Sequence, residues 1–165
     1  MNNRKKLIAW LFEKSQIIYT NYFKKNKPWG LTKSDLLKYP KNSFGKQLGK
    51  FLEKNDFDLI PKVERHDAYH VLTGFNTKVE DEIAQQYLCY GNGKRSPYLF
   101  GVIILGTIIL PEYLNYYIKS YRIGKSANAF YNLDFKRLLN IPFKDLQSSI
   151  FTKSQIHNLK TLYHA

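Results

Sequence analysis

The sequence contains little sulfur and no long apolar run. Cys89 is the only cysteine in 165 residues, which excludes an intrachain disulfide and favours a reducing compartment. The longest apolar stretch, residues 98–110, is 13 residues long and is ended by Pro111, whereas a membrane-spanning helix needs about 20. The basic N-terminus precedes only a short apolar patch, unlike a signal peptide. We therefore expect a cytoplasmic protein without a targeting peptide or a spanning helix.

Acidic residues are scarce. The chain has 13 Asp and Glu against 26 Lys and Arg, a formal net charge of +13, and five of the acids fall in residues 64–82. Nucleic-acid binding is one interpretation, but no zinc-finger spacing, RRM motif or basic heptad array is present, so no specific nucleic acid is expected. An anionic membrane surface is the second interpretation, and solubility alone is the third.

Strand patterns are missing as well. Alternation of apolar and polar residues is nowhere sustained, whereas helical spacing recurs along the chain. With 44% apolar and 24% charged residues, the composition is that of one globular domain, residues 1–165. The sequence predicts an all-α, single-domain helical bundle. The expected helices cover residues 3–25, 44–55, 61–73, 77–91, 97–110, 111–122, 133–140, 142–150 and 153–163.

Helix-end residues fix several of these boundaries. Ser43 is suited to cap the second helix, and Pro61 fits the first turn of the third, which Gly74 then closes. Thr77 and Glu80 have the spacing of a capping box that opens the next helix. Residues 63–90 are therefore expected to form a helical hairpin.

The N-terminal segment, residues 1–25, predicts an amphipathic helix. Leu7, Leu11, Ile18 and Tyr22 share one helical face, and lysines and arginines are available to its flanks. Such a helix can lie on an anionic membrane surface, at the inner face of the membrane, or can pack on the protein core. The sequence leaves both interpretations open.

Four potential metal ligands cluster around the expected corner of the hairpin. On a helix, His66, Asp67 and His70 lie at roughly 0°, 100° and 40°, so they share one sector. Counted from Asn76, Glu82 lies as far after the corner as His70 lies before it, and it therefore faces His70 in an antiparallel pair. Two imidazoles and two carboxylates at one point favour a divalent cation.

Two other enzyme classes share part of this pattern. HD-type phosphohydrolases use a His–Asp pair, but they need a further upstream histidine, and residues 1–65 contain none. In a thermolysin-like protease Asp67 would replace the catalytic glutamate, and its shorter side chain would sit farther from a metal-bound water. A His-x3-His pair used only for packing is the remaining alternative.

The segment HDAYHVLTGFNTKVEDE resembles the Coq4 family of ubiquinone-biosynthesis proteins, because it carries that family's His-Asp-x-x-His-x11-Glu motif intact. The resemblance extends to SFGKQLGKFLEKNDFD and YRIGKSANAFYNLDFKRLLNIPFKDLQ, about residues 40–150. It implies an all-helical, often dimeric protein at a membrane, with a prenyl lipid in an apolar groove or tunnel. It further implies that His66, Asp67, His70 and Glu82 bind a divalent metal, generally zinc; iron, cobalt or manganese would suit the same ligands.

The resemblance also implies an activity and partners. The family is associated with removing the C1 carboxylate of a prenylated hydroxybenzoate-type precursor, by decarboxylation or hydroxylation, and with organising other quinone-biosynthesis proteins. Arg65 and Tyr69 are candidates for orienting an anionic head group, or ordinary surface residues. Residues 98–110 line a groove for an isoprenoid tail or form a buried core helix. A lyase-type enzyme and a non-catalytic prenyl-lipid carrier both remain open.

Overall fold

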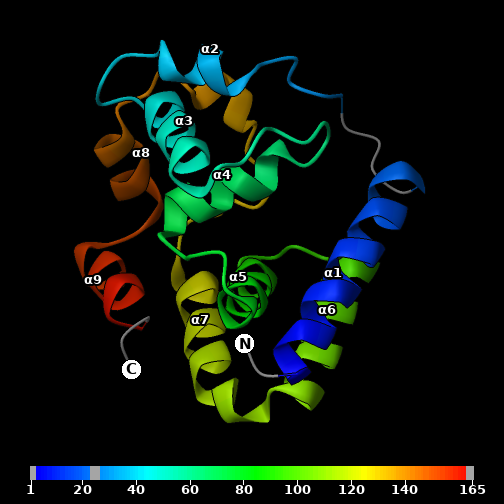
Figure 1. The fold of residues 1–165 in the computed structure, drawn as a ribbon. Helices are drawn as coiled ribbons and strands as arrows, with labels where there is room; N and C mark the ends of the chain where they lie inside the picture. The colour runs from blue at the N-terminus through cyan, green and yellow to red at the C-terminus, as the bar shows by residue number, and fades with distance from the viewer. Residues whose placement is uncertain (1–2, 23–26, 163–165) are drawn as a thin grey trace.

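The computed structural model describes the backbone of residues 3–22 and 27–162, and the side chains of 3–15 and 27–162. Within these ranges the chain forms α-helices and two short 3-10 helices and no strand, which confirms the all-α prediction (Figure 1). The elements are α1 (Asn3–Tyr22), α2 (Lys33–Leu37), α3 (Phe44–Asn55), α4 (Glu64–Thr73), α5 (Val79–Gly91), α6 (Pro97–Ile109), η1 (Pro111–Tyr113), α7 (Leu114–Ser126), η2 (Phe135–Leu138), α8 (Phe143–Ile150) and α9 (Lys153–Leu162).

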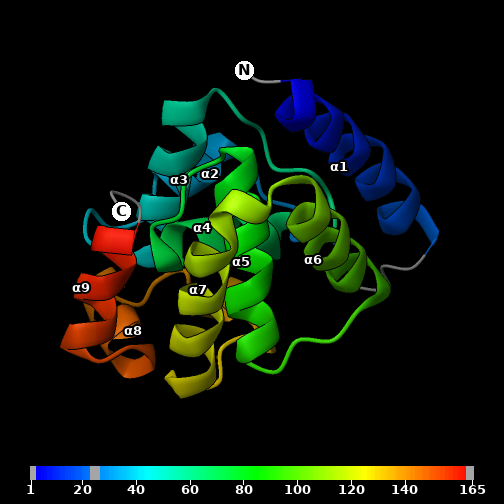
Figure 2. The ribbon, with the colours of Figure 1, turned by 90° about the horizontal axis from the view of Figure 1, so that it is seen from below.

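Two glycines bring α5 and α7 into close contact at the centre of the domain, where Figures 1 and 2 show the two helices side by side. A Cβ on Gly124 would lie 2.0 Å from the carbonyl oxygen of Leu88, and one on Gly91 would lie 2.2 Å from that of Tyr121. No side chain fits at either position, because backbone occupies the space. The close crossing anchors α5, which carries the Glu82 side of the predicted site.

The predicted ends of α3 and α4 are largely confirmed. The Ser43 hydroxyl accepts a hydrogen bond from the backbone of Lys46, and Gly74 ends α4 in the left-handed region at φ +78°. However, α4 begins at Glu64 and not at Pro61, because Lys62 has a positive φ of 70°, which interrupts a helix. Residues 63–90 thus contain α4 and α5, joined by the turn at Gly74, and we call this segment the α4–α5 hairpin.

The predicted capping box before α5 is wrong by one residue. The helix begins at Val79, its N-cap is Lys78, and no side chain caps it. The carboxylate of Glu80 instead lies 2.9 Å from the ammonium of Lys5 on α1. The Glu80 carboxylate, which the sequence pattern predicted would cap the start of α5, thus forms an ion pair with a distant helix.

Two further elements differ from the sequence prediction. Helix α2 was not predicted, although Thr32 and Asp35 form a complete capping box at its start. The helix expected at 133–140 is only the 3-10 turn η2. Cys89 is fully buried, as a small apolar side chain would be, and it forms no disulfide.

Helices α1 and α6 form a flank beside the α5–α7 centre (Figures 1 and 2). Arg4 makes two hydrogen bonds to the carboxylate of Glu112, at 2.8 and 3.2 Å, and one to the carbonyl of Ile109. Ile8 is buried, whereas Leu7 on the predicted apolar face is half exposed. Residues 23–25 of the predicted helix and the side chains of Ile18 and Tyr22 lie outside the described residues.

The prediction of a buried helix at 97–110 is only partly correct. Leu99, Val102 and Gly106 are buried, and Gly106 meets Ile83 of α5. The remaining side of α6 is open, and Ile108 is 71% exposed. Among the described residues no single helix is long and apolar enough to cross a membrane. The segments Pro97–Ile109 and Pro111–Ser126 reach the required length and hydropathy only when taken together, and they meet at a bend of 105°.

Candidate metal centre

Helix α4 presents two imidazoles on one face. His66 and His70 are one turn apart, and their ring centroids are separated by 4.7 Å. The predicted sharing of a helix sector is therefore observed. His70 is almost fully buried, whereas the His66 side chain is one quarter exposed. One imidazole is held inside the protein, and the other is reachable from solvent.

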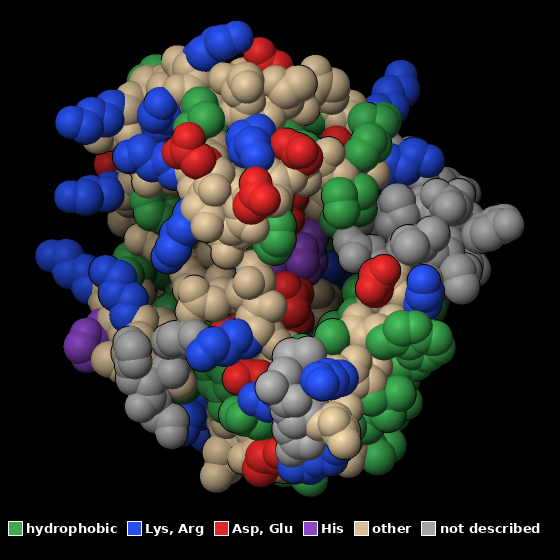
Figure 3. Space-filling model, in the orientation of Figure 1, with side chains coloured by type: hydrophobic (Ala, Val, Ile, Leu, Met, Phe, Trp, Pro, Cys, Tyr) green, Lys and Arg blue, Asp and Glu red, His purple; other side chains and the backbone are tan. Residues whose placement is uncertain are grey.

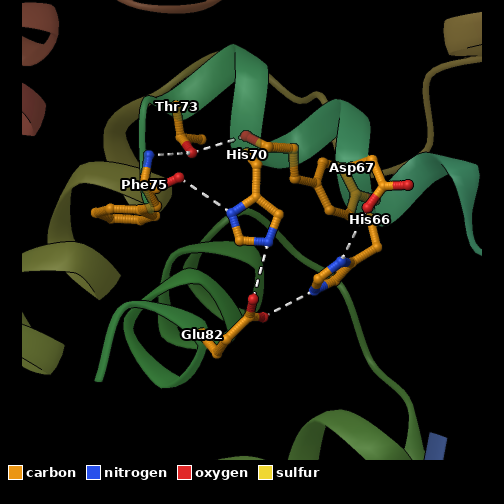
Figure 4. A network of polar contacts seen from close by, with 7 residues as sticks. His66, Asp67, His70, Thr73, Phe75 and Glu82 are labelled. Atoms are coloured by element: carbon orange, nitrogen blue, oxygen red, sulfur yellow. Dashed lines mark hydrogen bonds and ion pairs between the residues drawn. The ribbon is translucent and has the colours of Figure 1, made fainter. Parts of the chain in front are cut away.

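Glu82 of α5 faces both imidazoles. Its Oε2 lies 2.9 Å from Nε2 of His66, and its Oε1 lies 3.1 Å from Nε2 of His70 (Figure 4). The two contacts come from different oxygens of one carboxylate, so Glu82 bridges the pair. The predicted opposition of His70 and Glu82 across the corner is confirmed.

The corner itself fixes the tautomer of His70. The carbonyl oxygen of Phe75 lies 3.1 Å from Nδ1 of His70 and can only accept, so Nδ1 carries the hydrogen (Figure 4). The left-handed Gly74 turns the chain back so that this carbonyl meets the ring. In the neutral imidazole Nε2 therefore presents a lone pair to Glu82, whereas in the imidazolium Nε2 donates a hydrogen bond to that carboxylate.

A lone pair and a carboxylate oxygen at 3.1 Å repel each other unless a proton or a cation lies between them. The donor atoms of His66, His70 and Glu82 lie within 4.8 Å of one another. In a tetrahedral zinc site with bonds of about 2.0–2.1 Å, ligand atoms are roughly 3.3 Å apart. The three residues thus fit one divalent cation after small side-chain adjustments.

Asp67, predicted as the fourth ligand, does not join this group. Its Oδ1 lies 3.7 Å from Nδ1 of His66, on the side of the ring away from Glu82 (Figure 4). A carboxylate at that nitrogen orients a histidine whose other nitrogen binds a metal. The structure gathers three of the four predicted ligands and places Asp67 beside His66, because adjacent positions on a helix point about 100° apart.

The ionisation of the group reflects this arrangement. Burial lowers the pKa of His66, but the charges of Glu82 and Asp67 outweigh burial and raise it to about 9. Burial raises the pKa of Glu82, and the two imidazoles more than offset this and hold it well below its usual range. Without a metal, a proton on the histidines compensates the Glu82 carboxylate, and a cation has to displace that proton.

Of the two predicted orienting residues, Tyr69 has its hydroxyl engaged elsewhere in the protein. Tyr69 is buried in the core, and its phenol donates a hydrogen bond to the carbonyl of Tyr131 at 2.8 Å. Burial raises the pKa of this phenol, and the charge of Arg65 opposes that rise. The burial of Tyr69 does not favour a contact with a head group, whereas the role of Arg65 stays a prediction.

Two residues that the sequence analysis did not assign to the site lie next to the metal ligands. The ring of Phe51 on α3 stacks on His70 with a centroid distance of 5.4 Å and an interplanar angle of 13°. Tyr98 at the start of α6 is half-buried, and burial and the charge of Glu82 raise its pKa. No local motif marks either residue, because both contacts depend on how distant helices pack.

The surface opens directly above this group. Figure 3 shows histidine and acidic side chains at the floor of a hollow, with hydrophobic side chains on its rim. Phe57 and Ile60, in the segment before α4, are 41% and 53% exposed. A polar, cation-binding floor beneath an apolar rim suits a ligand with an anionic head and an apolar body.

Comparisons with known proteins bear on the fold. No family model matches the sequence, and no curated protein matches it significantly. A crystal structure of a Nostoc punctiforme PCC 73102 protein, named as a candidate ubiquinone biosynthesis protein, is similar with a TM-score of 0.63. The likeness covers 92% of this chain and 83% of that one at 16% sequence identity. At this identity the two proteins share their all-helical fold.

Proposed function

We propose that the chain is a metal-binding protein of quinone biosynthesis, which binds the C1 carboxylate of a prenylated hydroxybenzoate-type precursor and supports its removal. The observation that carries the proposal is the convergence of His66, His70 and Glu82, whose donor atoms lie within 4.8 Å of one another at a largely buried position. The fold shared with the Nostoc protein supports the pathway.

His66, His70 and Glu82 would hold the metal, for which zinc is our first choice. When bound, a divalent cation supplies positive charge for a carboxylate and for the negative charge that develops on the ring. The chain's own residues keep the donors in place: the Phe75 carbonyl fixes His70, and Asp67 orients His66. Three protein donors leave room for a substrate oxygen, as in catalytic zinc sites.

The reaction that we propose needs no oxidant. The bond between C1 and the carboxylate breaks, the electron pair stays on the ring, and a proton from water takes the place of the departing CO2. The protein's part is to bind the anion and to limit water around it. Phe51, stacked on His70, closes one side of the site with an apolar surface.

The membrane is the partner that supplies such a lipid substrate, and α6 provides a surface for it. Six large apolar side chains of α1 and α6 are 40–71% exposed, and we call them the α1–α6 apolar face: Leu7, Trp10, Phe100, Ile104, Leu105 and Ile108. Exposed Lys6 and Lys14 on α1 add the positive charge that anionic lipids attract. We propose peripheral binding to the cytoplasmic side of a membrane. A homodimer and contacts with other quinone-biosynthesis proteins are proposed from the family resemblance alone.

The same apolar face favours a second candidate function, a non-catalytic carrier of prenyl lipids. The two functions differ in what the metal ligands do. In an enzyme, His70→Ala should abolish both metal binding and turnover of a prenylated hydroxybenzoate. In a carrier, the same variant should still retain lipid.

Elemental analysis of the purified protein, together with a lipid extract, tests the proposal. We expect about one divalent metal per chain and an isoprenoid lipid in the extract. His70→Ala should lose the metal while its circular dichroism stays helical. Full turnover by metal-free protein would refute the enzyme, and the absence of any lipid, with no vesicle binding, would refute both candidates.

A further inference from the structure

A second charged cluster lies on the face of α4 next to the metal ligands. Arg65 and Tyr69 lie one turn apart on the same side of this helix, and the charge of Arg65 opposes the burial that raises the pKa of the phenol. The ammonium of Lys94, in the connection between α5 and α6, lies 5.3 Å from the centroid of the same tyrosine ring. Two basic side chains, both half-buried, therefore meet at one tyrosine.

These two positive charges are not neutralised by the protein. Within residues 3–22 and 27–162, neither Arg65 nor Lys94 forms an ion pair with a carboxylate. The acidic group that acts on Lys94 is the thiol of Cys89, and burial raises the pKa of that thiol to about 11, so it is neutral at pH 7. Burial and the charge of Arg65 lower the pKa of Lys94, as expected for a cation near a second cation with no carboxylate between them.

The cluster is also rigid. The Tyr69 phenol is fixed by its hydrogen bond to the carbonyl of Tyr131, and its oxygen can still accept a hydrogen bond. Lys94 follows Gly93, which has a positive φ of 106° and packs against the ring of Tyr131. Tyr131 thus fixes both the tyrosine under Arg65 and the turn that carries Lys94. Most N–H groups of the guanidinium remain available for a ligand.

We propose that Arg65 and Lys94 form a binding site for a dianionic phosphoryl group. Two half-buried cations without a counter-ion are stabilised by a ligand of charge −2, and the guanidinium fork matches phosphate oxygens. The site is separate from the three metal ligands, and it does not depend on the function proposed above. A ligand bound by both would carry two anionic groups, one at the metal and one here.

Inorganic phosphate, titrated into the full-length metal-free protein at low salt and followed by NMR, is the probe. We expect saturation at one phosphate per chain, with the backbone signals of Arg65 and Lys94 shifting first. Arg65→Gln and Lys94→Gln should each weaken binding about tenfold or more, since each removes a charge-assisted hydrogen bond. Lys94→Arg, which keeps the charge, should bind phosphate like the wild type.

Exposed residues elsewhere supply matched controls. Arg122→Gln on α7 and Lys50→Gln on α3 remove the same charges and should leave phosphate affinity unchanged. Zinc binding by the Arg65 and Lys94 variants should also be unchanged, so failure here is distinguishable from failure of the metal site. Non-saturable shifts spread over many lysines, equal weakening by the controls, or tighter binding of benzoate than of phosphate would overturn the proposal.

Discussion

The α4–α5 hairpin and the α1–α6 flank hold their side chains in different ways. In the hairpin, each imidazole contacts two partners, and α5 is locked to α7 by backbone contacts at Gly91 and Gly124. On the flank, α1 is held at its start by the ion pairs of Arg4 and Lys5, and large apolar side chains face outward. Fixed geometry suits a metal centre, whereas an apolar face without fixed partners suits a fluid lipid surface.

The largest expected effect concerns Glu82, which contacts both histidines of the hairpin. Glu82→Gln should weaken zinc binding by at least about 100-fold, because it removes the charged ligand that both histidines face. Competition with a zinc chelator measures the affinity. Glu53→Gln on the exposed side of α3 is the matched control and should bind zinc like the wild type. Equal affinities of the two variants would contradict the assignment.

A glycine substitution should change the free energy of unfolding in opposite directions in the two regions, at the α5–α7 contact and on α6. Gly124→Ala should lower the free energy of unfolding by about 1–3 kcal/mol, because its Cβ would overlap the Leu88 carbonyl and push α5 away from α7. Gly101→Ala on α6 has open space around its Cβ and should raise stability by about 0.5–1 kcal/mol. Urea denaturation measures both. A neutral Gly124→Ala would show that the crossing is looser than the structure indicates.

A substitution on the α1–α6 apolar face should weaken membrane binding without affecting the metal site in the hairpin. Ile108→Ser should weaken binding to anionic vesicles about tenfold, since a largely exposed side chain no longer enters the bilayer. Its unfolding free energy and zinc affinity should change little. Vesicle sedimentation measures the binding, and Ile83→Val, in the buried interior, is the control that changes stability and not vesicle binding.

The corner of the hairpin provides a smaller and more specific test. Gly74→Ala and Gly30→Ala both place a side chain at a positive φ, +78° and +67°, in open space, so each should cost about 1 kcal/mol of stability. Only the first should also weaken zinc binding, because Gly74 sets the Phe75 carbonyl against His70. Isothermal titration of zinc measures this difference. Equal zinc affinities of the two variants would contradict the role of the Gly74–Phe75 turn in orienting His70.

The pH dependence tests the ionisation of the same site without any substitution. In the metal-free protein the pKa of His66 is raised to about 9 from 6.5, so its contribution to stability is complete below pH 6.5 and is lost as the pH rises through 9. Zinc binds the deprotonated histidines and should preserve stability over that range. The stability gained from zinc should therefore grow from pH 6.5 to 9. Thermal denaturation with and without zinc measures the gain.

Much of this arrangement could be predicted from the sequence, because helical spacing and a symmetric corner are local features. They suffice to place His66, His70 and Glu82 together, and Ser43 and Gly74 at helix ends. The remaining features depend on contacts between helices that are distant in the sequence. Lys5 takes Glu80 away from the predicted cap, and Phe51 reaches His70 only through the packing of α3 on α4.

The exposure of α6 was also beyond local reasoning, since a helix that is apolar all round is usually buried. Here α5 and α1 both pack against α6 but leave Phe100, Ile104, Leu105 and Ile108 exposed. Asp67 presented the same difficulty. The helical spacing and the family resemblance favoured it as a fourth ligand, but its carboxylate lies at Nδ1 of His66, the nitrogen that does not contact Glu82. Both cases needed the positions of neighbouring helices.

Zinc stoichiometry combined with X-ray absorption spectroscopy tests the central assignment most directly. We predict one zinc per chain, with two imidazole nitrogens and carboxylate oxygen among its ligands, and loss of that signal in a His66→Ala, His70→Ala, Glu82→Gln triple variant. Zinc bound equally by the triple variant, for example through the exposed His157 on α9, would contradict it.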